Sequence, residues 1–273
     1  MKKQLTTLLV RPAARGGKYL GPDAANANHQ SALVFLLNPV TEALVAYGIA
    51  DASNPLSAGP LDLMSPVSRS APFATDDNTV QVQLSVEISE PTDLRVLVYG
   101  PLSHPDQAQI AQADITVLPG VNIGTSPQFP EGLVIEVPGL CISNVTADWH
   151  GSKVSCFAKV TMMCGCPIRN GAVNPGWFWP DSDFSVQLVT YMKSKAVHYY
   201  RLAFDNTPGL VSSFSGQWPT QASQNDSVEQ AWLYVSEPKL GNQGKYRISP
   251  AFTQSPLRLP QDVQKVILEL RDK

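Results

Sequence analysis

The chain has 273 residues, of which 43% are hydrophobic and 16% are charged, and its formal net charge is −3. This length suffices for two ordinary domains with buried cores. Lys and Arg are too few and too scattered for the basic stripe that nucleic acid binding needs, so we expect no nucleic acid partner. No stretch approaches the ~20 apolar residues of a membrane-spanning helix, so we expect no transmembrane segment.

The N-terminus starts like a signal peptide, with Met1 followed by two lysines. The apolar run from Leu8 to Val10 is too short for a signal peptide, and Arg11 interrupts it. We therefore expect a cytoplasmic protein or one that is already processed or exported. The polar but weakly charged composition suits a packed assembly or an extracellular protein better than a free cytosolic enzyme.

Residues 1–118 are predicted to form an N-terminal β-sandwich domain. Residues 4–10 are a plausible first strand, and residues 31–38 and 42–49 have the pattern of an antiparallel hairpin. This hairpin resembles part of the carboxypeptidase-regulatory and transthyretin-like sandwiches. The resemblance covers about 20 residues and implies a β-sandwich fold alone.

The clearest pattern in the chain is the alternation of apolar and polar residues from Val80 to Ser89. Alternation of this kind predicts an antiparallel strand with one face in the core and one in solvent. We expect residues 92–100 to pair with this strand across Glu90 and Pro91, and residues 101–112 to form a polar loop or a short helical turn.

Residues 119–250 are predicted to form a second, immunoglobulin-like β-sandwich domain, because short apolar segments alternate there with turns. The expected strands are 133–137, 140–146, 154–166, 184–192, 196–204, 228–235 and 244–249. The Cys, Trp, Cys spacing of true immunoglobulin domains is absent, so the pattern predicts the architecture and not the family.

The strand that begins at Val154 carries three cysteines on one face, together with Met162. Buried thiols are one interpretation, since free Cys is among the most buried residue types. A soft metal site for copper or zinc is another, with Cys164, Cys166 and Met162 as ligands and His150 or Cys141 completing the set. A disulfide between Cys141 and Cys156 is the third.

Aromatic residues gather in the loop after this strand, at Trp177, Phe178 and Trp179, and a further Trp follows at Trp218. Exposed rings of this kind stack on sugars or anchor protein interfaces, and buried ones plug the end of a sandwich. Asp181 and Asp183, like Asp76-Asp77-Asn78, fit either a loop site for Ca²⁺ or ordinary turn chemistry.

Residues 251–273 are predicted to be a linker followed by a docking segment. Val263, Val266, Ile267 and Leu270 fit the apolar stripe of a helix, whereas Val266, Leu268 and Leu270 fit a strand. Such a tail docks on its own chain or is donated to a neighbouring subunit.

No catalytic motif for acyl transfer, zinc hydrolysis, or phosphate or dinucleotide binding is present in the sequence. The sequence therefore favours a non-catalytic structural or assembly protein that forms a homo-oligomer or docks into a larger complex. The alternatives are a binding module, for carbohydrate through the Trp residues or for copper or zinc through the cysteines, and an accessory subunit of an enzyme complex. No organic cofactor is expected.

Overall fold

The computed structural model describes residues 2–15, 20, 32–50, 81–102, 105, 107–127, 132–150, 153–163, 167–177, 179–208, 210–219, 227–239, 241–249 and 259–271. These residues form three sheets, in which most neighbouring strands are antiparallel, and a C-terminal helix. This confirms the predicted all-β class. They divide into two compact units. Unit 1 holds the described residues up to Val137 together with the C-terminal helix, and unit 2 holds those from Pro138 to Ser249.

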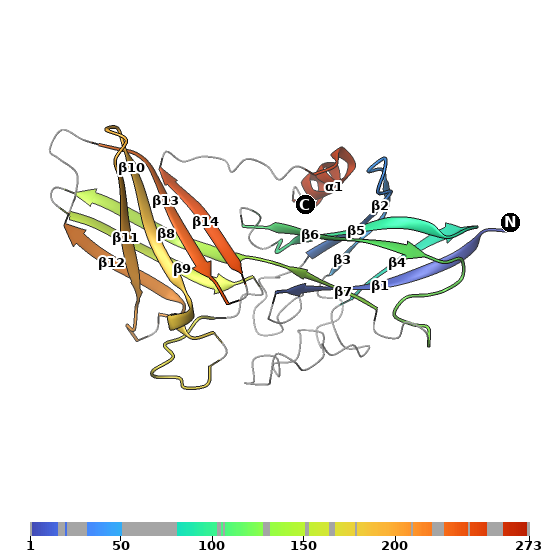
Figure 1. The fold of residues 1–273 in the computed structure, drawn as a ribbon, viewed down its shortest axis with the longest axis horizontal. Coiled ribbons are helices and arrows are strands. Elements are labelled where there is room, and N and C mark those ends of the chain that lie inside the picture. The colour runs from blue at the N-terminus through green and yellow to red at the C-terminus, as the bar shows by residue number, and fades with distance from the viewer. Residues whose placement is uncertain are drawn as a thin grey trace. The chain divides into compact units, whose positions relative to one another are not determined.

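Unit 1 contains two sheets (Figure 1). The smaller sheet has the order β4-β1-β7, from β1 (Gln4–Ala14), β4 (Val82–Ile88) and β7 (Leu133–Val137). Its central strand β1 runs antiparallel to β4 and parallel to β7. The larger sheet is antiparallel with the order β3-β2-β5-β6, from β2 (Ala32–Leu37), β3 (Leu44–Ala50), β5 (Thr92–Gly100) and β6 (Gln109–Val117).

The two sheets of unit 1 bury an apolar layer between them. On β4 the odd-numbered side chains are exposed, while Val82, Leu84 and Val86 are buried, so the predicted alternation is confirmed. Gly48 of β3 faces Val82 and Leu84 of β4, which brings the edges of the two sheets together. The strand β2 is buried along its whole length, so both of its faces are covered.

The second cover of β2 is the helix α1 (Gln261–Arg271), which settles the open choice between helix and strand. Pro260 precedes the helix and accepts its first hydrogen bond from the Gln264 N–H, a position that suits proline. Val263 and Val266 are buried against the larger sheet, on a cluster formed by Leu33, Phe35, Leu37, Leu97, Tyr99 and Ala108. Ile267 and Leu270 pack at the margin of the same cluster.

The pairing that we expected between residues 80–89 and 92–100 is wrong. The strand β4 pairs with β1, and β5 pairs with β2 and β6, so the two strands lie in different sheets. Both strands have an apolar face, and the short corner at Pro91 lets each turn that face toward the buried interior of unit 1.

Unit 2 is built on one antiparallel sheet with the order β14-β13-β10-β11-β12-β9-β8 (Figure 1). Its strands are β8 (Leu140–His150), β9 (Lys153–Met162), β10 (Ser185–Met192), β11 (Val197–Phe204), β12 (Ser213–Pro219), β13 (Val228–Glu237) and β14 (Asn242–Ser249). The short 3-10 helix η3 (Asp181–Asp183) precedes β10. Along β9 every second side chain is buried, so the predicted face with Cys156 and Met162 belongs to the core.

The first and last strands of this order, β14 and β8, come together, so the sheet curls into a barrel-like form. A Cβ at Gly244 would lie 3.1 Å from Ile142 Cδ1 and 3.3 Å from the Leu140 carbonyl oxygen. The Gly139 N–H donates to Asn242 Oδ1 over 3.0 Å in a buried position. The two facing sheets of an immunoglobulin-like domain are not confirmed for this unit.

Nowhere in the described ranges is there a helix long and apolar enough to cross a membrane.

Candidate functional site

The tryptophans of the predicted aromatic site do not form one exposed surface. Trp179 is 1% exposed and is among the largest fully buried side chains of the described chain. Trp177 donates from Nε1 to the Pro167 carbonyl oxygen over 3.1 Å, and the Arg169 guanidinium lies 4.2 Å from its ring centroid. Trp218 packs on Tyr200, and Phe178 lies outside the described residues.

The two aspartates near η3 have partners within the protein. Asp181 Oδ1 accepts a hydrogen bond from the Gly171 N–H over 2.8 Å. Asp183 Oδ1 lies 2.6 Å from Lys239 Nζ in an ion pair. These contacts are an ordinary turn hydrogen bond and an ion pair with a surface lysine. The other candidate calcium loop, residues 76–78, lies outside the described residues.

Cys141 and Cys156 are buried and neither forms a disulfide, so the suggested disulfide between them is wrong. The register explains why, since Cys141 lies opposite Thr161 whereas Cys156 lies opposite Ala147. Burial raises the pKa of the Cys156 thiol to about 12, so it is neutral at physiological pH.

The proposed metal ligands Cys164 and Cys166, and the side chain of His150, lie outside the described residues. Met162 is fully buried in the core of unit 2. Among the described side chains, no three His, Cys, Asp or Glu lie close enough to hold a metal ion.

A different surface of unit 2 carries exposed rings. On the outward side of β10, β11 and β13, opposite the core, lie five apolar or aromatic residues that we call the aromatic face: Tyr191, Val197, Tyr199, Trp232 and Tyr234. Tyr199 is 63% exposed and Tyr191 is 42% exposed. The strand register places the residues of the aromatic face side by side. Tyr191 lies opposite Val197, and Val189 of β10 lies between Tyr199 of β11 and Trp232 of β13.

Three cations border the aromatic face. Arg247 and Lys245 of β14 lie over the Trp232 ring, 5.4 Å and 6.0 Å from its centroid. Arg201 of β11 shares a row with Tyr234 through Gln187. Among the described residues, the rows across these four strands that carry the face contain no Asp or Glu, whereas the net charge of the whole chain is negative.

The sequence contained a signal for this face. The predicted hairpin and strand alternate in polarity, and their solvent-facing positions carry Tyr and Trp where polar residues are usual. Trp232 and Tyr234 share one parity in the sequence, but their proximity to Tyr199 depends on the strand order, which the sequence does not give.

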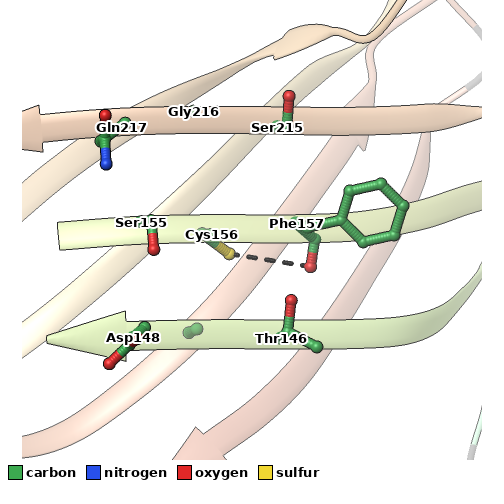
Figure 2. Close-up of a pocket in the computed structure, with 9 residues that line it drawn as sticks. Thr146, Asp148, Ser155, Cys156, Phe157, Ser215, Gly216 and Gln217 are labelled. Atoms are coloured by element: carbon green, nitrogen blue, oxygen red, sulfur yellow. Dashed lines mark hydrogen bonds between the residues drawn. The ribbon is translucent and has the colours of Figure 1, made fainter. Parts of the chain in front are cut away.

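A second feature is a hollow of about 660 Å³ on the solvent-facing side of three neighbouring strands (Figure 2). Three residues from each of β8, β9 and β12 line it: Thr146, Ala147, Asp148, Ser155, Cys156, Phe157, Ser215, Gly216 and Gln217. None of the nine is basic. The Ser215 hydroxyl also donates to Asp205 Oδ2 over 3.2 Å. Hydrogen bonds from Thr207 foremost, and from Ser215, hold the pKa of Asp205 below its ordinary value.

The chain matches no family model and no curated protein. Among solved structures it is similar to a DUF3823 family protein from Bacteroides ovatus, with 11% identity and a TM-score of 0.28 over 89% of this chain and 96% of that one. A DUF3823 family protein from Parabacteroides merdae has 9% identity and a TM-score of 0.23, over 90% of this chain and 99% of that one. At these TM-scores the likeness carries no argument about fold or function.

Proposed function

We propose that the protein is a non-catalytic docking protein, which joins a larger complex by binding an acidic protein surface through its aromatic face. The observation that supports this proposal is the cluster of exposed Tyr and Val side chains on the outward side of the sheet in unit 2. An accessory subunit of an enzyme complex is one case of this function.

Exposed aromatic rings on adjacent strands leave apolar surface in water, which is unfavourable unless a partner covers it. Single apolar side chains on a protein surface are normal, but contiguous apolar patches mark interaction sites. Tyr and Trp are enriched among the residues that dominate binding energy, because they bury a large area with few rotatable bonds. The aromatic face has four such rings within three neighbouring strands.

The charge pattern favours a different protein over a second copy of this chain. A symmetric dimer brings the same patch of both subunits together. Here that arrangement would bring the cations of one copy, Arg201, Lys245 and Arg247, close to those of the other, and like charges across an interface cost binding energy. An acidic partner surface complements them instead and speeds association.

A nucleic acid is a weaker candidate for this face. Single-stranded nucleic acids need free aromatic rings on which bases stack and a basic groove for the backbone. Arg247 and Lys245 lie over Trp232, so this ring has cations where a base would stack. The chain as a whole has 20 basic and 23 acidic residues.

Affinity capture from cells that make the protein tests the proposal. The baits are the full wild-type chain, a Tyr191→Ala, Tyr199→Ala double variant, and a Tyr47→Ala control that removes an exposed Tyr from unit 1. We expect one acidic protein to be retained by the wild type and the control and lost by the double variant. Retention of that protein by the double variant contradicts the proposal, and loss after nuclease treatment assigns the face to nucleic acid.

A further inference from the structure

We propose that one end of the barrel-like sheet in unit 2 is a binding site for a small aromatic compound that carries a hydrogen-bond acceptor. The site lies on the inner side of the sheet and is formed by five residues that we call the barrel-end cluster: Trp149, Thr190, His198, Tyr200 and Trp218. The aromatic face and the hollow lie on the outer side, so the inference is independent of the proposed docking function.

The strand register places the barrel-end cluster on the inner side of the sheet. Trp149 of β8 and Trp218 of β12 both lie opposite Val154 of β9, which is 1% exposed. Residues directly opposite one another on neighbouring strands project from the same face, so both indole rings belong to the buried side. Thr190 of β10 is also 1% exposed and lies opposite His198 of β11. The cluster therefore points into the interior of unit 2.

All members of the cluster lie toward one end of the sheet. Trp149 and Trp218 are the last residues but one of β8 and β12, whereas His198 is the second residue of β11, which runs the other way. The centroid of the Tyr200 ring lies 5.3 Å from that of Trp218 and 6.5 Å from that of His198. The three rings therefore form one continuous group across β11 and β12.

The two ends of the interior differ in character. At the end where β14 meets β8, the inward side chains are apolar and buried, among them Ile142, Met162, Val186 and Phe214. At the end with the barrel-end cluster, Trp149, His198 and Trp218 are only partly buried, so the interior reaches solvent there. Small β-barrels hold their ligands in such a mouth.

Two polar groups of the cluster are buried without a hydrogen-bond partner in the described part of the chain, the Trp149 Nε1–H and the Thr190 hydroxyl. Such groups are rare in folded proteins, because a buried donor that makes no hydrogen bond is unfavourable. In the order of the sheet, three strands separate β8 from β10 on one side and two strands on the other. The two groups therefore lie on opposite walls of a barrel whose width suits one small ligand.

The two groups and the rings set the class of ligand. Trp149 Nε1 can only donate, whereas the Thr190 hydroxyl donates or accepts, so a ligand that serves both carries an acceptor. The Tyr200 and Trp218 rings pack well on another flat ring, which favours an aromatic body. An aromatic amide combines an aromatic ring with a carbonyl acceptor.

The charged residues near this end do not decide the ligand class. Asp148 and Lys153 belong to the outer side of the sheet, because they alternate with Trp149 and Val154 along their strands. Glu229 lies at the register shift of β13 and is exposed. The ligand class therefore follows from the donors and the rings, and neutral probes test it.

The test is a titration of the full-length protein with benzamide, followed through the indole N–H signals by NMR. The comparison probes are toluene, which has the ring without the acceptor, and acetamide, which has the acceptor without the ring. Trp149→Phe identifies the Trp149 signal by its loss. We expect benzamide to shift this signal with a Kd in the millimolar range, and both comparison probes to bind at least about fivefold more weakly.

Thr190→Val keeps the shape of the side chain and removes the hydroxyl. This variant is expected to weaken benzamide binding about fivefold without lowering Tm, because the hydroxyl that it removes has no partner within the described protein. The matched control is Trp232→Phe, which removes an indole from the outer side of the same sheet and is expected to bind as the wild type does.

Three results would overturn the proposal. The first is a Trp149 signal that benzamide leaves unmoved at tens of millimolar, which would mean that water satisfies the two groups. The second is binding of toluene or acetamide as tight as that of benzamide. The third is wild-type affinity in Thr190→Val, or a loss of binding in Trp232→Phe that assigns the probe to the aromatic face.

Discussion

Trp179 is a core residue in the structure, although its place in an aromatic loop also fitted a sugar or protein contact. Its side chain is buried and Arg169 donates a backbone hydrogen bond to its carbonyl oxygen over 3.1 Å. Trp179→Ala is therefore expected to lower the free energy of unfolding by about 3–5 kcal/mol, because it leaves a large cavity. Urea unfolding followed by circular dichroism measures this change.

Val173→Ala is the control for that experiment, since Val173 lies in the same loop and is 72% exposed. Its effect on the free energy of unfolding is expected to stay within about 0.5 kcal/mol. Equal stability of the Trp179→Ala variant and the control would show that Trp179 is not part of the core.

Cys156 gives unit 2 a stability that depends on pH at alkaline values. Burial raises the pKa of its thiol from 9.0 to about 12, so the folded state holds the proton that the unfolded state releases. The resulting stabilisation is complete below pH 9 and is lost as the pH rises from 9 toward 12. Urea unfolding at several pH values is expected to show a steeper alkaline loss of stability in the wild type than in Cys156→Ala. Equal slopes would contradict this account.

At the scale of elements, α1 covers the outer face of the larger sheet in unit 1. Val263 is fully buried against the cluster that includes Phe35, whereas Leu268 on the same helix is 49% exposed. Val263→Ala is expected to lower the free energy of unfolding by about 2 kcal/mol, and Leu268→Ala by much less. Chemical denaturation of both variants measures the difference, and equal effects would show that α1 does not dock on this sheet.

The closure of the sheet in unit 2 depends on Asn242. Its side chain accepts from the Gly139 N–H and donates to Glu237 Oε2 over 3.3 Å, in a buried position. Asn242→Ala removes both bonds and is expected to lower the free energy of unfolding by roughly 2–3 kcal/mol. Gln243→Ala, at the exposed neighbouring position, is expected to be neutral. Thermal unfolding of the two variants measures these effects. An Asn242→Ala variant as stable as the wild type would contradict the role of Asn242 in closing the sheet.

The sequence predicted individual strands well and their partners poorly. Alternation identified β4 and β9 because one face of each is buried and the other is in solvent. It did not identify β6 or β12, in which Gln, Gly and Pro interrupt the pattern. The hollow could not be predicted without β12, and the aromatic face needed the order of β13, β10 and β11. Hydrogen-bonded partners are set by long-range packing, which a local pattern does not contain.

At the scale of the whole molecule, the two compact units are not two consecutive parts of the chain. Unit 1 needs residues from both ends of the chain, since α1 packs on β2 and β5. The residues of β7, which we expected to open the second domain, pair with β1 in unit 1. Parallel pairing of strands so far apart in sequence has no local signal. The aromatic face and the hollow both belong to unit 2.

The most direct test of the docking proposal is site-specific photo-crosslinking in cells that make the protein. A photoreactive phenylalanine analogue replaces Tyr199 of the aromatic face in one version and the exposed Tyr47 of unit 1 in another. We predict one discrete adduct with an acidic protein from position 199, which is absent from position 47 and is lost when Arg201 and Arg247 are changed to Glu. An adduct with a second copy of the chain, or the same adducts from both positions, would contradict the proposal.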